Sequence, residues 1–273
     1  MTRREQRRRW LKRHKRYETI GQRILRKGFR LAAQRINLDS LNEFNFRTLI
    51  ALNMGEVSYL FVDLYERVGV AEGKKVGRQL NREIREQKNF DPKTFEYGYR
   101  EMITRWLIVN GGERITSVRD ELIEHLIKFI AARLQNGGDM QTIVGELKKY
   151  ILSRGFYRWQ IERIVRTETT AAANFGAIQA GNNANIIWEK VWISSRDSRT
   201  RRRPEDAFDH FEIDGMRVAK GEKFNVQGDL LEYPGDPKGQ PANVINCRCA
   251  VSVVPKRDSN GKIIFTNRAR PQQ

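Results

Sequence analysis

The feature that most limits the possible fold is a change of pattern near residue 185. Between residues 40 and 181, apolar side chains recur every three or four positions, as in helices with one buried face. After residue 185 the sequence turns to short β-branched and aromatic runs separated by glycine and proline, which is typical of strands joined by turns. The prediction is an α+β protein, with a mostly helical N-terminal region followed by a small β-rich C-terminal domain.

Start and stop signals divide the helical part. The capping box Ser40–Glu43 and the Asp91-Pro92 pair each predict the start of a helix. The clearest amphipathic helix runs from Ile115 to Leu134 and ends at an Asn-Gly-Gly sequence, and a further helix is expected from Tyr157 to about Gly181. We therefore expect five or six helices between residues 40 and 181, with their apolar stripes forming a core.

Four short runs predict strands, at residues 186–193, 216–218, 223–226 and 250–254. Asn260-Gly261 predicts a hairpin turn, since both residues accept positive φ. The expected organisation is a basic helical arm, a helical domain, a small α+β domain, and a C-terminal hairpin and tail. Their predicted bounds are 1–39, 40–184, 185–256 and 257–273.

Positive charge is concentrated at the N-terminus. The chain carries a net charge of +18, and residues 1–35 hold fourteen Lys and Arg against two Glu. Such a block predicts a polyanionic partner such as DNA, although an acidic protein surface, lipid headgroups or a merely solvated helix face are alternatives. Three arginines near residue 202 form a smaller candidate patch. The candidate phosphate contacts are Arg3, Arg4, Arg7, Arg8, Arg9, Lys12, Arg13, Lys15, Arg16, Arg201, Arg202 and Arg203.

Several classes of protein are not expected. The sequence contains no run of about 18 apolar residues, so no membrane span is predicted. The arginine-rich N-terminus also lacks the apolar region of a secretory signal. Two cysteines cannot make a disulfide framework, so a reducing cytoplasm is the expected site of synthesis. The phosphate-binding, dinucleotide-binding and HExxH zinc motifs are absent from the sequence.

The residues with the most chemistry lie between Trp192 and Cys249. His210, Cys247 and Cys249 are suitable soft-metal ligands, and Asp197 is a conceivable fourth. Two arguments count against zinc: Cys-x-Cys is tighter than the usual spacing, and on a strand the two thiols would point to opposite faces. The prediction is therefore no cofactor, with zinc as a minor alternative.

Two other interpretations of these residues remain open. A nuclease or injected effector could use Asp197, His210 and Cys247 for general base or nucleophilic chemistry. In the structural interpretation the histidine hydrogen-bonds within a small domain, and the cysteines pack as small hydrophobes. The other histidines, His14 and His125, are expected at the surface. No catalytic residue is predicted.

The same ordered set resembles the C-terminal signature of the phage Mu F-like minor head proteins, the phage head-morphogenesis family. The resemblance covers roughly residues 140–255. Upstream, Arg166-Thr167-Glu168-Thr169 resembles the "RTE" helix of that family. The matching residues are Trp192, Asp197, Arg199, Thr200, His210, Asp214, Gly215, Phe224, Pro234, Gly235, Asn246, Cys247, Arg248 and Cys249.

The chain departs from this family at two places. Many relatives carry a Cys-x-x-Cys pair after the Asp-Arg-Thr step and a His-Pro before the closing Asn-Cys-Arg-Cys. Here those places read Arg201–Pro204 and Pro241–Ile245. The loss of these ligand-like residues counts further against zinc.

The resemblance implies a non-enzymatic virion protein, made in the host cytoplasm and located on the capsid interior near the portal vertex. Its implied partners are the portal protein and packaged double-stranded DNA bound without sequence preference, with the major capsid or scaffold protein as further candidates. Its implied roles are head morphogenesis, DNA packaging and DNA ejection, with no membrane partner. A scaffold-like assembly factor that leaves the mature particle is the remaining alternative.

Overall fold

The structure is a computed structural model that describes residues 2–35, 45, 57–84, 91–107, 112–152 and 154–266. Helices fill the first two thirds of these residues and small antiparallel sheets the last part, so the predicted α+β class is confirmed. None of the described helices is long and apolar enough to span a membrane. The long helices are α1 (Arg3–Arg35), α3 (Val57–Ile84), α4 (Pro92–Trp106), α5 (Gly112–Gln135), α6 (Met140–Leu152) and α7 (Arg154–Asn182).

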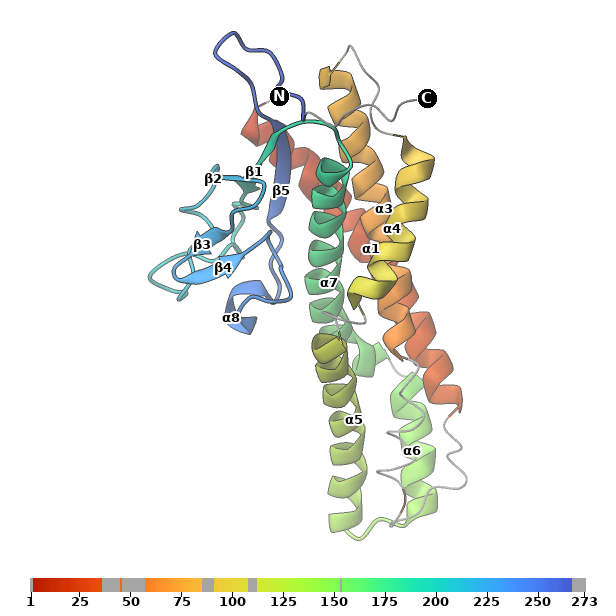
Figure 1. The fold of residues 1–273 in the computed structure, drawn as a ribbon. Coiled ribbons are helices and arrows are strands. Elements are labelled where there is room, and N and C mark those ends of the chain that lie inside the picture. The colour runs from red at the N-terminus through yellow and green to blue at the C-terminus, as the bar shows by residue number, and fades with distance from the viewer. Residues whose placement is uncertain are drawn as a thin grey trace.

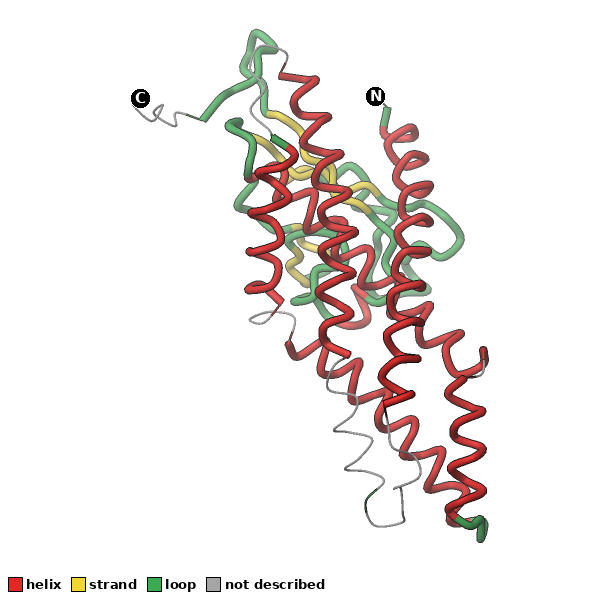
Figure 2. Tube along the Cα trace, turned by 90° about the vertical axis from the view of Figure 1, so that its right-hand side faces the viewer, coloured by secondary structure: helices red, strands yellow, loops and turns green. Residues whose placement is uncertain are grey.

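Helix α7 is the centre of the molecule. Helices α1, α3 and α4 lie along one side of it and the strands along the other, while α5 and α6 extend from the lower end, away from the strands (Figure 1). The view from the side shows the strands behind the helical layer (Figure 2). The chain is therefore elongated, with a β-rich unit attached to one half of a helical body.

Small residues let α7 pack closely on α3. A Cβ atom added at Gly176 would lie 2.2 Å from the carbonyl oxygen of Gly69, so the two backbones are in contact at this point. Ala171, Ala172 and Ala173 on α7 are also small, and all three are fully buried. Because helix α7 is covered on both sides, its uncharged second half is explained by burial between two layers.

Helix α1 is packed against the molecule along its length. Trp10, Tyr17 and Leu25 are buried, and the helix contacts α3, α7 and β1. The predicted helix is thus confirmed, although the limit of an arm at residue 39 lies outside the described residues. His14, which was expected at the surface, is buried beside Thr170, with 2.7 Å between Nε2 and Oγ1. It belongs to the same face of the helix as the apolar residues, one turn from Trp10.

A buried carboxylate ties α1 to α3. The guanidinium of Arg13 donates two hydrogen bonds of 2.8 Å to Glu72, and the hydroxyl of Tyr17 donates a third. Although burial opposes it, the charge of Arg13 keeps the pKa of Glu72 below its usual value. Glu72 is therefore a compensated charge and is part of the packing between the two helices.

Several predicted helix ends are confirmed. Asp91 caps α4, since its side chain accepts from the backbone N–H of Lys93 and Thr94, with Pro92 in the first turn. Helix α5 ends at Gln135, and Gly137 just beyond it has a φ of +78°, which is of the left-handed kind that glycine favours. The capping box at Ser40–Glu43 and the tail after residue 266 lie outside the described residues.

The C-terminal unit contains two small antiparallel sheets. One has the order β2-β1-β5, and β1 pairs with β5 so that Val191 faces Ser252; the other joins β3 to β4. The β4 strand was missed, because Gln227-Gly228 is not a common turn sequence, yet both residues adopt positive φ here. The elements are β1 (Trp188–Ile193), β2 (Arg217–Ala219), β3 (Phe224–Val226), β4 (Asp229–Leu231), α8 (Pro241–Val244) and β5 (Ala250–Pro255).

The predicted turn at Asn260-Gly261 is present, with one correction. The backbone N–H of Asp258 donates to Lys262, and that of Gly261 donates back to Asp258. Gly261 has a φ of +78°, whereas Asn260 is not among the residues with positive φ. The connection is therefore a three-residue loop with glycine in the left-handed position, and not a two-residue turn.

Candidate functional site

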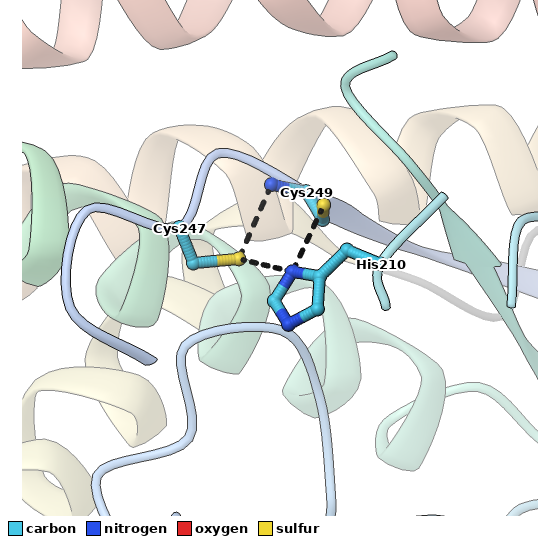
Figure 3. Close-up of side chains that lie close together, drawn as sticks. All are labelled: His210, Cys247 and Cys249. Atoms are coloured by element: carbon cyan, nitrogen blue, oxygen red, sulfur yellow. Dashed lines mark hydrogen bonds between the residues drawn. The ribbon is translucent and has the colours of Figure 1, made fainter. Parts of the chain in front are cut away.

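His210, Cys247 and Cys249 form a buried cluster in the C-terminal unit. The imidazole Nδ1 atom lies 3.6 Å from each of the two sulfur atoms, and all three ligand atoms lie within 4.8 Å of one another. Figure 3 shows the imidazole facing both sulfurs, which come from the segment just before β5. No side chain in the cluster is more than 2% exposed.

The argument that Cys-x-Cys would separate the thiols was wrong. Residues 247–249 precede strand β5 and have no strand conformation themselves. Asn246, with a φ of 59°, turns the chain just before this segment, and both sulfurs lie beside the imidazole of His210 (Figure 3). Because alternation of side chains applies only to extended strands, it did not hold for this segment.

The backbone of this segment is held by side chains from the helices. Thr170 donates to the carbonyl of Cys247 (2.6 Å), the indole of Trp10 donates to that of Arg248 (2.8 Å), and Asn174 donates to that of Cys249 (3.0 Å). Three consecutive carbonyls are thereby satisfied by three side chains on α1 and α7. The conformation of the cysteine segment is thus determined by helix residues that lie up to 238 positions away.

The helix residues of the "RTE" pattern take part in the same junction. The hydroxyl of Thr167 accepts from the backbone N–H of Asn246 (2.9 Å), and Arg166 donates to the side chain of Asn246 (3.1 Å). Glu168 accepts from the hydroxyl of Tyr65 on α3 (2.9 Å). The first part of this pattern binds the cysteine segment, and the glutamate binds the helical body.

A hydrogen-bonded chain supports His210 from the other side. Nε2 of His210 lies 2.5 Å from Oδ1 of Asn243, and the amide of Asn243 donates to Asp229 (2.7 Å). Because the amide nitrogen faces the carboxylate, the amide oxygen faces the histidine, and Nε2 carries the proton. Trp192 packs edge-on against the same imidazole, with 5.2 Å between the ring centroids.

Asp214 and Gly215 join the end of β1 to α1. The carboxylate of Asp214 accepts from the backbone N–H of Ser194 and forms ion pairs of 2.8 Å with Arg7 and Arg196. Gly215 has a φ of +90°, and a Cβ atom there would lie 1.9 Å from the guanidinium of Arg3. The Asp-Gly pair therefore serves to dock the start of α1.

Asp197 lies outside the cluster and is not a fourth ligand. It accepts from the backbone N–H of Arg199 and from the hydroxyl of Thr200, and forms an ion pair with Arg248. Arg199 itself is exposed. Of the three residues of the nuclease interpretation, the structure brings His210 and Cys247 together and directs Asp197 to Arg248.

The two thiols affect each other's ionisation. The hydrogen bond with Cys249 and burial raise the pKa of Cys247 well above its usual value. Although burial opposes it, the hydrogen bond from Cys247 lowers the pKa of Cys249. Without a bound cation, at most one of the two sulfurs is therefore expected to be a thiolate.

The cations of α1 fall on two sides of the helix. Arg3 donates to the carbonyl of Asp214, Arg7 to that of Ser194, and Arg13 binds Glu72, so these three serve intramolecular contacts. Most of the remaining candidates lie away from these three, as a turn of about 100° per residue requires, while Arg9 lies one turn from Arg13 at the edge of the buried side. Arg3 is exposed despite its contact, and the other exposed candidates are Arg4, Arg8, Arg9, Lys12, Lys15 and Arg16.

The smaller patch at residues 201–203 also contains both a cation with an intramolecular contact and exposed cations. Arg201 donates to the carbonyl of Ile245 (2.6 Å) and is part-buried, whereas Arg202 and Arg203 are exposed. The guanidinium of Arg202 lies 4.5 Å from the centroid of the Phe211 ring. Only the last two of these arginines are exposed to a partner in the described structure.

The exposed cationic side of α1 continues beyond the predicted residues. The same helical spacing would have found the later cations, because they repeat on the side opposite the buried face. A small cleft between α1, α3 and β5 adds Lys75 and Arg82 beside Arg9. The exposed later cations are Arg23, Arg26, Lys27 and Arg30.

Comparisons with known proteins give little further information. No protein-family model matches the chain, and no solved structure matches it. The uncharacterized protein YqbB of Bacillus subtilis (strain 168) is similar, with 25% identity over 123 residues. The match covers 44% of this chain and 38% of YqbB, so the chain spans well under half of that relative's length.

Proposed function

We propose that this chain is a minor head protein of the phage head-morphogenesis type. It is a non-enzymatic virion component that sits on the capsid interior at the portal vertex, where it contacts packaged DNA through the exposed cations of α1. Assembly of the head, packaging and ejection of DNA are the processes that it serves, and the portal protein is its main protein partner.

One observation carries the proposal. Residues of the family signature come from separate parts of the chain, and they interlock at one junction between α1, α7 and the segment before β5. Thr167 binds Asn246, Asp197 binds Arg248, and Trp192 packs on His210. These signature residues contact one another, as expected of a set that belongs to one structural unit.

The cationic side of α1 supports the DNA partner. Exposed Lys and Arg run from Arg4 to Arg30, a length of about 40 Å along a helix. Duplex DNA carries one phosphate charge per about 1.7 Å, so a surface of this length can meet many phosphates at once. The contacts are with phosphates, and binding is therefore expected to be independent of sequence and steeply dependent on salt.

DNA binding is tested with a charge-neutralised variant of the full chain. We expect the variant to bind duplex DNA of random sequence more weakly, and the slope of log K against log salt to fall by about 3–4. Fluorescence anisotropy over a range of salt concentrations measures both. The variant replaces four exposed cations by glutamine, at Arg4, Arg8, Lys12 and Arg16.

A matched control removes the same amount of charge from another surface. We expect the control to retain the salt slope of the original chain, because its cations lie on α4 and α5. Equal losses in the two variants would show that net charge alone, and not the α1 surface, drives binding. The control replaces Lys93, Arg100, Arg105 and Lys128 by glutamine.

The place in the virion is tested on purified particles from the host that carries the gene. Mass spectrometry should detect the chain in mature particles, and a cryo-EM reconstruction without imposed symmetry should show it against the inner portal. Absence from mature particles but presence in immature ones would favour the scaffold-like alternative. Metal-dependent nicking of a plasmid that is lost in His210→Ala would favour the nuclease alternative.

A further inference from the structure

We propose that His210, Cys247 and Cys249 bind one zinc ion through Nδ1 and the two sulfurs. The inference concerns the chemistry of this cluster and does not depend on the function proposed above. It reverses the sequence-based expectation of no cofactor, which rested in part on the two thiols facing apart.

The distances match a tetrahedral zinc site. Zinc binds histidine nitrogen at about 2.0–2.1 Å and cysteine sulfur at about 2.3 Å, which at a tetrahedral angle separates the two atoms by about 3.6 Å. In the structure Nδ1 lies 3.6 Å from the sulfur of Cys247 and 3.6 Å from that of Cys249. The two nitrogen–sulfur separations are therefore those of a tetrahedral zinc site.

The histidine presents the correct atom. Nε2 carries its proton toward Asn243 at 2.5 Å, and Asn243 is held by Asp229 at 2.7 Å. The lone pair is therefore on Nδ1, which faces both sulfurs (Figure 3). A histidine that donates its second N–H to a polar chain is the usual arrangement at protein metal sites, where the outer contact orients the ring.

Hydrogen bonding to the imidazole accounts for only one of the two sulfurs at this distance. A single lone pair on Nδ1 accepts one S–H, so the second sulfur lies equally close to Nδ1 without a bond to that atom. A metal ion contacts both sulfurs at once. The backbone N–H of Cys249 also points at the sulfur of Cys247, at 3.5 Å, which is a contact that stabilises a thiolate.

Charge balance also favours a divalent ion at this depth. The three side chains are 1–2% exposed, and burial of an uncompensated charge is costly. Two thiolates, a neutral imidazole and Zn²⁺ sum to zero net charge. Among the described residues no fourth His, Cys, Asp or Glu joins the group, so the fourth position is left to a small ligand such as water.

The test measures metal in the full chain, purified under reducing conditions in buffers without chelator. Elemental analysis should find about one zinc ion per chain, as expected of a single site. Cobalt(II) should replace it and give the visible bands of a tetrahedral ion together with a sulfur-to-cobalt charge-transfer band. Chelation should lower the melting temperature and added zinc should restore it.

Three variants assign the ligands. Cys247→Ser and Cys249→Ser should lose stoichiometric zinc, and circular dichroism reports whether each still folds. Asn243→Leu keeps all three ligands but removes the support of the imidazole, and it should weaken zinc binding by about 10- to 100-fold. The control His125→Gln changes a histidine on α5 outside the cluster and should keep full zinc content.

Three results would overturn the proposal. The first is an unmodified chain without zinc that also fails to retain added zinc under reducing conditions. The second is a disulfide between Cys247 and Cys249, seen as a mass two hydrogens lighter that reductant reverses. The third is stoichiometric copper or iron in place of zinc, which would overturn the choice of ion. The first two are read on the original chain, so a variant that fails to fold cannot obscure them.

Discussion

The helical body and the junction with the C-terminal unit are held by different kinds of contact. Between α3 and α7 the contacts are apolar and close, with backbone against backbone at Gly69 and Gly176. Between α7 and the segment before β5, the contacts are hydrogen bonds from Thr170 and Asn174 to backbone carbonyls. The first kind depends on side-chain size, and the second depends on where polar atoms lie.

This difference explains how the cysteine segment can present its thiols. A side chain that binds a backbone carbonyl fixes the course of the chain without using the side chains of the bound segment. Cys247 and Cys249 are thus free to face His210 while their carbonyls are held by α7. A purely apolar junction would have required these side chains for packing.

The largest expected effect is at the junction. Asn174 donates to Pro234 and Cys249 and accepts from the backbone N–H of Val251, all within buried structure. Asn174→Ala should lower the free energy of unfolding by about 3 kcal/mol, because it leaves three buried backbone groups without partners. Urea unfolding measures this. The control Asn183→Ala, which removes one exposed hydrogen bond, should cost less than about 0.5 kcal/mol, and equal losses would contradict the account.

The next effect is in the helical body. Gly176→Ala should destabilise by about 2–3 kcal/mol, since its Cβ would meet the backbone of Gly69 and α3 would have to move. Thermal and urea unfolding give the size. A change at a second glycine is expected to have the opposite sign. In the described part of the chain, no atom outside α6 lies within 4 Å of a Cβ at Gly145, so Gly145→Ala should stabilise by about 0.5–1 kcal/mol. Stabilisation by both changes would show that α3 and α7 lie farther apart at Gly69 and Gly176 than in this structure.

The third effect depends on pH, through His14. Burial lowers its pKa to about 3, with the charges of Arg248, Arg166 and Arg199 acting in the same direction. The carboxylate of Glu18 lies 3.6 Å from Nδ1, but it is also paired with Arg166, so burial dominates. The unfolded chain, with a histidine pKa near 6.5, therefore binds the proton more readily than the folded chain.

Stability is consequently complete above about pH 6.5 and is lost as the pH falls toward 3. Between pH 7 and pH 5, the free energy of unfolding of the original chain should fall by about 2 kcal/mol more than that of His14→Gln. Urea unfolding of both proteins at the two pH values gives the difference. A parallel pH dependence in the two proteins would mean that His14 accepts a proton in the folded state.

The smallest expected effect on stability comes from removing a single hydrogen bond at the junction. Trp10→Phe keeps an aromatic ring between α1 and the C-terminal unit but removes one hydrogen bond, from the indole to the carbonyl of Arg248. The expected loss is about 1 kcal/mol, measured by urea unfolding. A loss as large as that of Asn174→Ala would show that the ring, and not the hydrogen bond, is the main contribution of Trp10.

Local structure was predictable where the cause was local. The cap at Asp91, the glycine end of α5 and the apolar spacing of the helices depend on neighbours within one or two turns. The β4 strand was missed because its turn, Gln227-Gly228, adopts positive φ without the usual sequence. Which cations of α1 are exposed could have been predicted from the sequence, since the spacing of Trp10, Tyr17 and Leu25 marks the buried side of the helix.

The sequence by itself determined the α+β class, the positions of the described helices, and the residue types able to bind phosphate or metal. These depend on composition and short-range spacing. The tertiary structure alone decided that Cys247 and Cys249 face His210, and that Asp197 faces Arg248 instead. The reason is physical: the conformation of residues 246–249 is set by hydrogen bonds from Trp10, Thr170 and Asn174, which only the folded chain brings within reach.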